Sequence, residues 1–393
     1  MIDLKVALFT GNYNHIRDGV SLTLNRWVSY LLDEGADVLV FGPTVENPDI
    51  DHTGEMSVVP SVKMPGRPEY RITTGLPEDN RTRLEEFNPD IVHIASPDIL
   101  GLKALKWARE EDVPIVSSYH THFTSYLKYY NLGIIESLGW KYLQWFYSHC
   151  KHIYVPTQSM ADELVEKGIG SSPDVLKIWA RGVDTDLFNP SRRDVQWREQ
   201  RGFSEKDVVL TFVSRLVWEK NLRLFASVVK DIQHKYSNVK SMIVGDGPAR
   251  SELDEMLPDT HFTGFLTGKD LATAYASSDT FFFPSDTETF GNVTLEAMAS
   301  GLPCLVADAQ GSKSLVDHGV NGYLVSVDHP GKFKKYAEKL VTDDDLRNEL
   351  GRSSLEIARN FTWEKINRGL LNNYLEVLGK KTEKSDLNET ESF

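Results

Sequence analysis

Cysteine is scarce in this chain of 393 residues, which contains two, Cys150 and Cys304. Two cysteines so far apart supply neither a disulfide framework nor a cysteine-rich zinc site, and they fit a reducing cytoplasm. A run of about 20 apolar residues, which a membrane-spanning helix needs, is also missing. The start, Met1 to Lys5, lacks a basic segment followed by an apolar core, so we expect neither secretion nor a membrane span.

Positive charge is outnumbered in the composition. Lys and Arg total 43 against 57 Asp and Glu, which gives a net charge of −14. This balance disfavours a broad nucleic-acid-binding or anionic-membrane-binding surface, although a local basic pocket stays compatible with it. The length exceeds one ordinary hydrophobic core, and apolar residues make up 40% of the chain, so we expect two globular domains.

Short apolar, β-branched runs alternate with helix-length segments along the chain. The first series of runs covers residues 6–9, 38–41, 91–94, 115–118 and 153–155. After an Arg-rich stretch the alternation restarts, with runs at residues 208–213, 242–244, 280–283 and 304–307. Such alternation is typical of parallel α/β sheets. The sequence therefore predicts two α/β domains, with residues 189–201 as the hinge between them.

A final helix is predicted after Thr362, which is a suitable N-cap. Its apolar face is formed by Leu370, Leu371, Tyr374, Leu375 and Leu378. Beyond Lys380 the chain is charged and has almost nothing to bury, so we expect a mobile tail.

The segment 284–298 combines a strand end, a glycine turn, a helix start and two carboxylates. Gly291 lets the backbone approach a ligand closely. The N–H groups of Asn292, Val293 and Thr294 are expected to be free at the positive end of the helix dipole, where a phosphate is stabilised. Glu288 precedes the turn and Glu296 lies about one helical turn after it, so one ligand can touch both.

Glu288, Glu296 and the following Ala-Met-Ala-Ser-Gly-Leu-Pro string resemble the signature of family-4 retaining glycosyltransferases of the GT-B fold. The resemblance implies that Glu288 holds hydroxyls of the donor sugar and that Glu296 binds the ribose, with Phe290 in the same donor loop. In isolation, the two Glu residues would be read as a loop charge and a solvated helix face.

The resemblance also implies the architecture: two Rossmann-like α/β domains that face each other across a cleft. Residues 1–190 would form the acceptor domain and residues 191–360 the nucleotide-sugar donor domain. Residues 361–379 would form a helix that crosses back to the first domain, followed by the tail at 380–393. The nucleotide sugar is a co-substrate, and no cofactor or metal is expected.

Arg215 lies at the end of a predicted strand, and Lys220 begins the next helical segment. Cations in a water-poor site stabilise the negative charge that grows on a departing nucleoside diphosphate. The resemblance assigns this role to the Arg-x4-Lys pair. The alternative is a surface pair in which Lys220 answers Glu219.

His120 directly follows the run at 115–118. An imidazole there can donate a hydrogen bond to sugar or phosphate, and the resemblance implies such a contact. His120 and His122 could instead be metal ligands or ordinary structural histidines, but no third ligand is signalled by spacing. The string from Ser118 to Phe123 resembles the branch that includes sulfoquinovosyl and mannosyl transferases acting on lipid acceptors.

Three further loops contain glycine. Gly19 follows Asp18 after the first strand, and the resemblance places it beside the transferred sugar, with a structural turn as the alternative. Gly182-Val183-Asp184-Thr185-Asp186 is interpreted as a hinge loop and not as a metal site. Gly245-Asp246-Gly247-Pro248 lacks the third glycine of a dinucleotide fingerprint, so we expect it to shape the nucleotide-base side together with Phe265.

The segment 123–147 is unusually aromatic. Its aromatic residues include Tyr126, Tyr129, Tyr130, Trp140, Tyr142, Trp145, Phe146 and Tyr147. Two interpretations stay open: acceptor or lipid recognition, and ordinary core packing at helical spacing.

Taken together, the resemblance implies a retaining hexosyltransferase that moves sugar from GDP-mannose or a UDP-hexose to a hydroxyl acceptor, with an α-linkage. A glycolipid or polysaccharide precursor is the expected acceptor, and nucleic acid is not an expected partner. We expect a cytoplasmic protein, with peripheral contact at the inner face of the membrane as an option. The alternatives are a sugar-nucleotide epimerase or phosphorylase of the same plan, and a non-catalytic sugar-nucleotide-binding protein.

Overall fold

A computed structural model of the chain describes residues 2–65, 67–119, 133–170, 172 and 174–380. The chain divides into two compact units, one made of Met1–Trp179 with Ile366–Phe393 and the other of Ala180–Lys365. The domain boundaries predicted at residues 190, 360 and 379 stay predictions. Most of the predicted tail lies outside the described residues.

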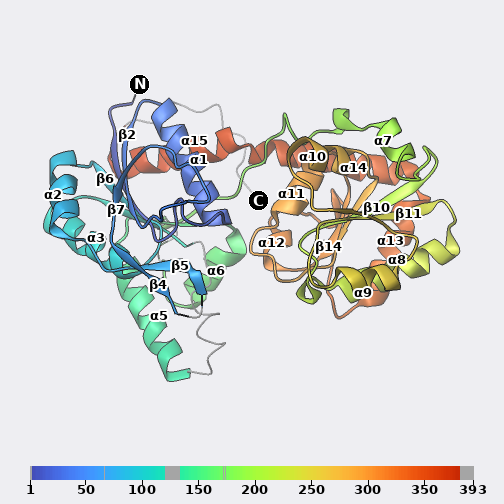
Figure 1. Cartoon of the computed structure of the whole chain (residues 1–393), viewed down its shortest axis with the longest axis horizontal. Helices are drawn as coiled ribbons and strands as arrows, with labels where there is room; N and C mark the ends of the chain where they lie inside the picture. Colours follow the sequence, from blue (N-terminus) through green and yellow to red (C-terminus); the bar gives the residue numbers. More distant parts are fainter. Residues whose placement is uncertain (1, 66, 120–132, 171, 173, 381–393) are drawn as a thin grey trace. The chain divides into compact units, whose positions relative to one another are not determined.

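The first unit contains a parallel seven-stranded sheet in the order β3-β2-β1-β6-β7-β8-β9 and a separate antiparallel hairpin, β4-β5 (Figure 1). Its strands are β1 (Lys5–Phe9), β2 (Asp37–Gly42), β3 (Glu55–Val58), β4 (Ser61–Met64), β5 (Arg67–Thr73), β6 (Ile91–Ile94), β7 (Ile115–Ser118), β8 (His152–Val155) and β9 (Leu176–Ile178). Its helices are α1 (Gly19–Asp33), α2 (Glu78–Phe87), α3 (Ile99–Glu110), α5 (Gly133–Tyr147), α6 (Gln158–Glu166) and most of α15 (Trp363–Val377).

Both faces of this sheet are buried. Successive side chains of a strand point to opposite faces, and in β1 Val6 and Leu8 join one apolar cluster while Ala7 and Phe9 join another. The cluster around Val6 includes residues of α1 and α15, and the cluster around Ala7 includes residues of α2 and α3. Helices on both faces explain why the strands are continuous apolar runs, as the sequence predicted.

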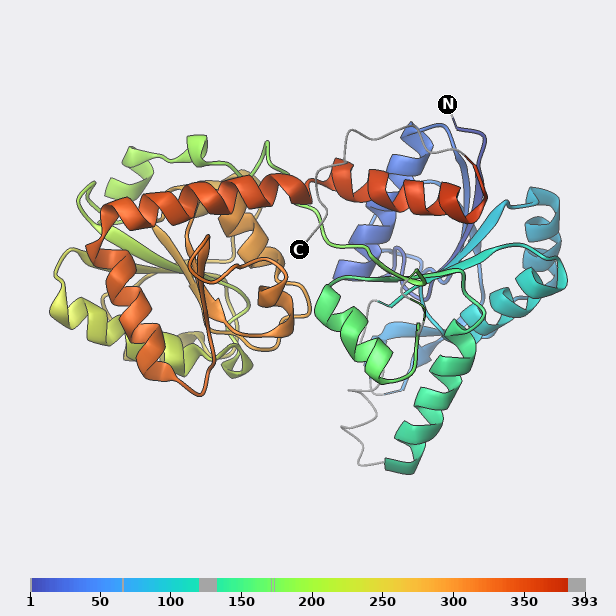
Figure 2. The ribbon, with the colours of Figure 1, turned by 180° about the vertical axis from the view of Figure 1, so that it is seen from behind.

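The C-terminal part of α15 packs against the core of the first unit, beside α1 (Figure 2). Trp27 Nε1 donates a hydrogen bond of 3.1 Å to Tyr374 Oη, which is also hydrogen-bonded to Nδ1 of His93. The other ring nitrogen, Nε2, lies 2.5 Å from Ser118 Oγ. Complete burial lowers the pKa of His93 to about 3, so this histidine is a neutral link in a buried hydrogen-bond chain.

The second unit contains a parallel six-stranded sheet in the order β12-β11-β10-β13-β14-β15. Its strands are β10 (Val208–Val213), β11 (Val239–Val244), β12 (His261–Gly264), β13 (Thr280–Phe283), β14 (Cys304–Ala307) and β15 (Gly322–Val325). Its α-helices are α7 (Val195–Glu199), α8 (Leu222–Lys235), α9 (Arg250–Met256), α10 (Gly268–Ala276), α11 (Asn292–Ala299), α12 (Gln310–Lys313), α13 (Pro330–Thr342) and α14 (Asp344–Ala358). Short 3-10 turns occur at η1 (Pro190–Arg192), η2 (Trp218–Lys220) and η3 (Arg359–Phe361).

The segment interpreted as a hinge, residues 189–201, lies within the second compact unit. Its Arg198 is 1% exposed, and its Nη1 contacts Asp279 Oδ2 at 3.0 Å and the carbonyl of Ser277 at 2.7 Å. The other terminal nitrogen donates to the carbonyls of Ser204 and Asp207. The Arg-rich segment thus contains a buried guanidinium with several partners in the second unit, and its role as a hinge stays a prediction.

The prediction of two α/β domains is confirmed by these two sheets. Among the helices of the described residues, none combines the length and the apolar character needed to cross a membrane.

Candidate functional site

The candidate site is built on the carboxyl ends of two neighbouring strands. Strands β10 and β13 pair in parallel, with Leu210 opposite Thr280 and Thr211 opposite Phe281. The loops that follow the two strands therefore leave the sheet at the same edge, where ligands of open α/β sheets bind. Lys220 follows β10 and Glu288 follows β13, so the tertiary structure brings these two predicted residues together.

Lys220 is the central cation of this edge. Its Nζ lies 2.6 Å from Glu288 Oε1 and 3.0 Å from Thr287 Oγ1. The Lys220 and Glu288 side chains are 17% and 21% exposed, so the pair is largely but not completely shielded from water. A charge-assisted hydrogen bond in such a place is stronger than one at the open surface. The alternative of a surface pair between Lys220 and Glu219 is therefore wrong, because Lys220 pairs with Glu288.

Asn221 ties the two loops to each other. It adopts a left-handed conformation with a φ of 55°, which Asn tolerates better than most residues. Its side-chain Nδ2 donates to the carbonyl of Pro284 at 2.9 Å and to Asp286 Oδ1 at 3.1 Å. The positions of Lys220 and Glu288 are thus fixed relative to each other before any ligand binds.

The start of α11 presents backbone N–H groups beside these side chains. Gly291 precedes the helix with a φ of 97°, and no side chain caps it. Within the described residues, the N–H groups of Asn292 and Val293 have no hydrogen-bond acceptor. The prediction of a third free N–H was wrong, because the N–H of Thr294 donates to the carbonyl of Gly291 at 3.0 Å in a tight first turn. Two donors remain at the positive end of the helix, where an anion is stabilised.

Glu296 is oriented by Tyr275 of α10. The Tyr275 hydroxyl lies 3.1 Å from Glu296 Oε2 and 3.1 Å from the carbonyl of Val293. Burial, followed by the nearby Glu296 charge, raises the pKa of Tyr275 well above its usual range, so the hydroxyl stays a hydrogen-bond donor. Glu296 is therefore a positioned carboxylate and not a freely solvated one.

Sequence reasoning missed Gly311 in α12. A Cβ at this position would lie 2.7 Å from the carbonyl carbon of Phe290 and 2.8 Å from the carbonyl oxygen of Glu288. The N–H of Gly311 donates to that Glu288 oxygen at 3.1 Å. Gly311 thus supports the loop that carries Glu288, and a lone glycine in a short polar segment gave no signal of this close approach.

The glycines at 245 and 247 have a comparable packing role. Cβ atoms there would lie 1.9 Å from the carbonyl oxygen of Ser214 and 2.4 Å from that of Leu216, both in the loop after β10. These glycines permit close backbone packing next to Arg215. Whether they also shape the nucleotide-base side stays a prediction.

The other predicted residues of this unit have different environments. Arg215 is exposed and forms no ion pair with any described residue. Phe265 is 77% exposed after β12 and is available to a ligand. Phe290 is 4% exposed, and its ring contacts Phe361 at a centroid distance of 6.3 Å. Its side chain is used in the core, so a donor contact from Phe290 would come from its backbone.

In the first unit, Gly19 is the first residue of α1, and Asp18 is its N-cap. The Asp18 carboxylate accepts from the N–H groups of Val20 and Ser21 and from Asn12 Nδ2. No described atom lies within 4 Å of a Cβ built on Gly19, so the space beside it is open. Asp18 has a structural capping role, whereas the sugar contact of Gly19 stays a prediction.

Two other predictions concern residues 120 and 184–186. His120 and His122 lie outside the described residues, so their roles stay predictions. Asp184 Oδ1 accepts from the N–H groups of Asp186 and Leu187 at 3.0 and 2.9 Å. This carboxylate therefore has a local turn-forming role, as the interpretation of a structural loop requires.

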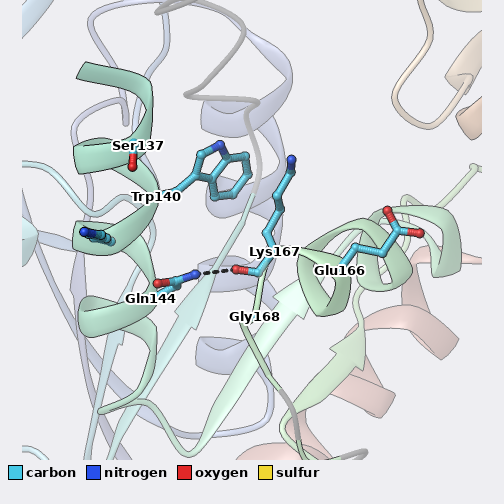
Figure 3. A pocket seen from close by; sticks show the side chains of 7 residues that line it. Ser137, Trp140, Gln144, Glu166, Lys167 and Gly168 are labelled. Atoms are coloured by element: carbon cyan, nitrogen blue, oxygen red, sulfur yellow. Dashed lines mark hydrogen bonds between the residues drawn. The ribbon is translucent and has the colours of Figure 1, made fainter. Parts of the chain in front are cut away.

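The described part of the aromatic segment divides between core and surface, and acceptor or lipid recognition stays a prediction. Phe146 and Tyr147 of α5 are buried in the core, while Leu138 and Trp145 are 60% and 42% exposed. An open hollow of about 610 Å³ lies between α5 and the end of α6. Lys167 Nζ lies 5.3 Å from the ring centroid of Trp140 in this hollow, whose lining residues are drawn in Figure 3. Gln144 Nε2 donates to the carbonyl of Lys167 at 2.6 Å and closes one side of the hollow.

Comparison with known proteins identifies the family. Residues 17–187 match the profile described as Glycosyltransferase Family 4, and residues 194–356 match the profile described as Glycosyl transferases group 1. A GDP-mannose-dependent alpha-mannosyltransferase of Corynebacterium glutamicum is 33% identical over 95% of this chain and 89% of its own length. Sulfoquinovosyl transferase SQD2 of Arabidopsis thaliana is 29% identical over 88% of this chain and 68% of its own length.

The solved structures show the same fold. A sucrose-phosphate synthase from Thermosynechococcus elongatus superposes with a TM-score of 0.74 at 16% identity, covering 96% of this chain and 99% of that one. These similarities do not favour the alternatives of an epimerase or a silent binding protein. The chain belongs to the family-4 glycosyltransferases of the GT-B fold, and it is a glycosyltransferase that uses a nucleotide sugar.

Proposed function

We propose that this protein transfers mannose from GDP-mannose to a hydroxyl acceptor with retention, forming an α-linkage. The observation that carries the proposal is the Lys220–Glu288 pair at 2.6 Å beside the two unpaired amides of α11. One loop therefore places a carboxylate that can bind sugar hydroxyls close to backbone N–H groups that can bind a diphosphate. The choice of GDP-mannose is supported by the name of the relative from Corynebacterium glutamicum.

In the proposed reaction, the bond between the sugar C1 and the β-phosphate oxygen breaks while C1 bonds to the acceptor oxygen. Lys220, Arg215 and the N–H groups of Asn292 and Val293 stabilise the charge that grows on the leaving diphosphate. The acceptor proton passes to an oxygen of this diphosphate, so atoms and charge balance. Glu288 binds hydroxyls of the sugar, Glu296 binds the ribose, and His120 contributes a further contact to the sugar.

The mechanism uses no protein nucleophile. Attack occurs on the face that the leaving group vacates, which gives retention of configuration. The two cations take the charge-stabilising role that a divalent ion takes in other sugar transferases, so we propose metal-independent turnover. We expect a chelator, added at fixed ionic strength, to leave the activity unchanged.

The proposed acceptor is a hydroxyl of a glycolipid or of a polysaccharide precursor. A lipid acceptor would require peripheral contact with the inner face of the membrane. The exposed Leu138 and Trp145 on α5 are the side chains that we propose for this contact, because aromatic and apolar residues bind at the lipid–water boundary.

A ligand panel followed by a transfer assay tests the proposal. GDP, UDP, GDP-mannose and UDP-glucose are added to the full chain, and the shift in unfolding temperature is recorded. A ligand at 100 times its Kd stabilises the folded state by about 2.7 kcal/mol. We expect GDP and GDP-mannose to stabilise it more than the uridine ligands do.

Product analysis then tests the reaction. The bound donor is incubated with acceptor, and the anomeric configuration of the product is determined by NMR. An α-product supports the proposal, and a β-product refutes retention. Conversion of the donor without acceptor would instead indicate an epimerase. Stronger stabilisation by uridine ligands would reassign the donor to a UDP-hexose.

A further inference from the structure

A second hollow, of about 390 Å³, is polar and lies in the second unit, at the edge of the sheet where strands β11 and β12 begin. We call it the amino-edge pocket, and its lining includes Arg201, Phe203, Gln233, Lys240, Thr260 and His261. We propose that the amino-edge pocket binds a small anion through phosphate or carboxylate oxygens, with Arg201, Lys240 and His261 as the donors.

The geometry of Arg201 carries most of this inference. Its guanidinium carbon lies 3.7 Å from the ring centroid of Trp197, and its Nη1 donates to the Trp197 carbonyl at 3.1 Å. The Nε atom is shielded from solvent and has no acceptor among the described residues. Nη2 makes no hydrogen bond to a described residue, so it is the guanidinium nitrogen that remains for an anion, as a charge-assisted donor. The stacking on Trp197 therefore fixes the group while this donor stays unused.

Two further donors line the same pocket. Burial, together with the charges of Arg201 and Arg250, lowers the pKa of His261, so its neutral ring can donate one N–H at neutral pH. The His261 ring packs edge-on against Phe203 at a centroid distance of 5.8 Å. Lys240 is half-buried and forms no ion pair with a described carboxylate.

The charge balance of the lining favours an anion. Arg201 and Lys240 are its two cations, and the exposed Asp259 is the one carboxylate among its described lining residues. A local excess of positive charge is notable in a chain with a net charge of −14. Two cations and one exposed carboxylate line the pocket, and this balance favours an anionic ligand.

The floor of the pocket is polar and already ordered. Thr260 Oγ1 lies 2.5 Å from Ser241 Oγ, and Gln233 Nε2 donates to the same Ser241 oxygen at 3.2 Å. On the rim, no described atom lies within 4 Å of a Cβ built on Gly202, so the entrance is open there. A hydrophilic ligand can enter without displacing an apolar core.

The amino-edge pocket is separate from the proposed donor site. It lies where β11 and β12 begin, at Val239 and His261. Lys220 and Glu288 follow the carboxyl ends of β10 and β13, at the opposite edge of the same parallel sheet. An anion in the pocket is therefore a different ligand from the donor diphosphate.

Calorimetric titration of the full chain with inorganic phosphate tests the inference. The variants are Arg201→Gln and Lys240→Gln in the pocket, Lys220→Gln at the donor site, and Arg223→Gln as a matched control. Arg223 is an exposed arginine that pairs with Glu252 away from the pocket. We expect each pocket variant to weaken phosphate binding about tenfold or more, because a hydrogen bond to a charged group contributes about 1.5–3 kcal/mol. Lys220→Gln and Arg223→Gln should each retain a phosphate site of wild-type affinity.

Three results would overturn the inference: no binding at millimolar phosphate, wild-type binding by both pocket variants, or loss of all binding in Lys220→Gln alone. If Arg201→Gln unfolds, the half-buried Lys240→Gln decides the outcome. A parallel titration with a hexose monophosphate distinguishes the source of the anion. Tighter binding than inorganic phosphate assigns the pocket to a phosphorylated metabolite, and equal binding assigns it to free phosphate. These measurements need no transfer activity, so they succeed or fail independently of the proposed function.

Discussion

Lys220 and Glu288, separated by 67 intervening residues in sequence, form an ion pair of 2.6 Å at the edge of the second-unit sheet. The Lys220 ammonium also contacts Thr287. The Lys220 side chain, which belongs to the loop after β10, is therefore held by the loop after β13. A donor diphosphate would compete with Glu288 for this ammonium, and the released carboxylate would be free to accept from sugar hydroxyls. Under the proposed function, the ion pair would hold both groups in place until a donor binds.

Replacing Glu288 with Gln removes the charge and keeps the shape of the side chain. We expect kcat/KM to fall about 100-fold, since the loss of a charge-assisted contact costs about 2–3 kcal/mol of transition-state stabilisation. We expect only a small fall in the unfolding temperature, because the Gln side chain can still accept a hydrogen bond from Lys220, whose side chain keeps some contact with water. Glu219→Gln, at an exposed neighbour of Lys220, is the matched control and should keep wild-type rates. Equal rates for wild type and Glu288→Gln would remove Glu288 from the site.

Tyr275 is a positioning residue for Glu296. Tyr275→Phe deletes the hydroxyl that bonds to Glu296 Oε2 and to the carbonyl of Val293. We expect KM for the donor to rise roughly 5–10-fold, equivalent to about 1–1.4 kcal/mol, with kcat nearly unchanged. Steady-state kinetics at varied donor concentration measures this split.

Tyr236→Phe is the control for that variant. In the wild type, the Tyr236 hydroxyl also donates to a carboxylate, that of Glu338, but at the surface between α8 and α13. The same chemical deletion there should leave KM unaltered. A fall in kcat with unchanged KM in Tyr275→Phe would contradict the positioning role of Tyr275.

Gly311 allows α12 to approach the Glu288 loop. In Gly311→Ala the new Cβ would overlap the backbone of Phe290 and Glu288 at distances of 2.7–2.8 Å. We expect a loss of unfolding free energy of about 1–3 kcal/mol from overpacking, together with weaker donor binding. Denaturant unfolding and nucleotide titration measure the two effects. Gly331→Ala in α13 should match or slightly exceed wild-type stability, because its Cβ meets no described atom within 4 Å.

The buried His93 makes stability depend on pH. Its folded pKa is lowered from the ordinary value of 6.5 to about 3 by burial, so the unfolded state binds more protons between these values. The unfolding free energy is therefore fully present above pH 6.5 and falls as the pH drops through this window, by about 1.4 kcal/mol per pH unit.

His93→Gln removes the protonation of this side chain on unfolding and leaves the other histidines unchanged. Below pH 6 we expect the variant to lose stability less steeply than the wild type, although it is less stable at pH 8. Urea unfolding at several pH values measures both slopes. Parallel slopes would mean that His93 does not stay neutral in the folded protein.

The central strands of both domains were predictable because helices cover both faces of each sheet. Predicted runs at 91–94, 115–118, 208–213, 280–283 and 304–307 coincide with β6, β7, β10, β13 and β14. The sequence did not predict the four edge strands of the two large sheets, which are β3, β9, β12 and β15. It also did not predict the β4-β5 hairpin. Three of these edge strands, β3, β9 and β12, are partly exposed and mix polar with apolar residues, as the Leu-Lys-Ile of β9 illustrates. The fourth, β15, is mostly buried and was missed although it contains Tyr-Leu-Val.

The C-terminal helix was also predictable. Thr362 Oγ1 accepts from the N–H of Lys365, as expected of an N-cap, and the apolar face around Tyr374 is buried. Its buried polar partners could not be foreseen, because His93 and Trp27 are distant in sequence and follow no local pattern.

The sequence alone located the candidate site, because a glycine turn, a helix start and carboxylates beside a strand end lie within one short segment. Tertiary structure decided how these groups are used. It paired Lys220 with Glu288 and not with Glu219, engaged the Thr294 amide in the first helical turn, and placed Gly311 against the loop that carries Glu288. The physical reason is that parallel strands bring loops together through register and packing, and neither of these is encoded by the spacing of residues within one loop.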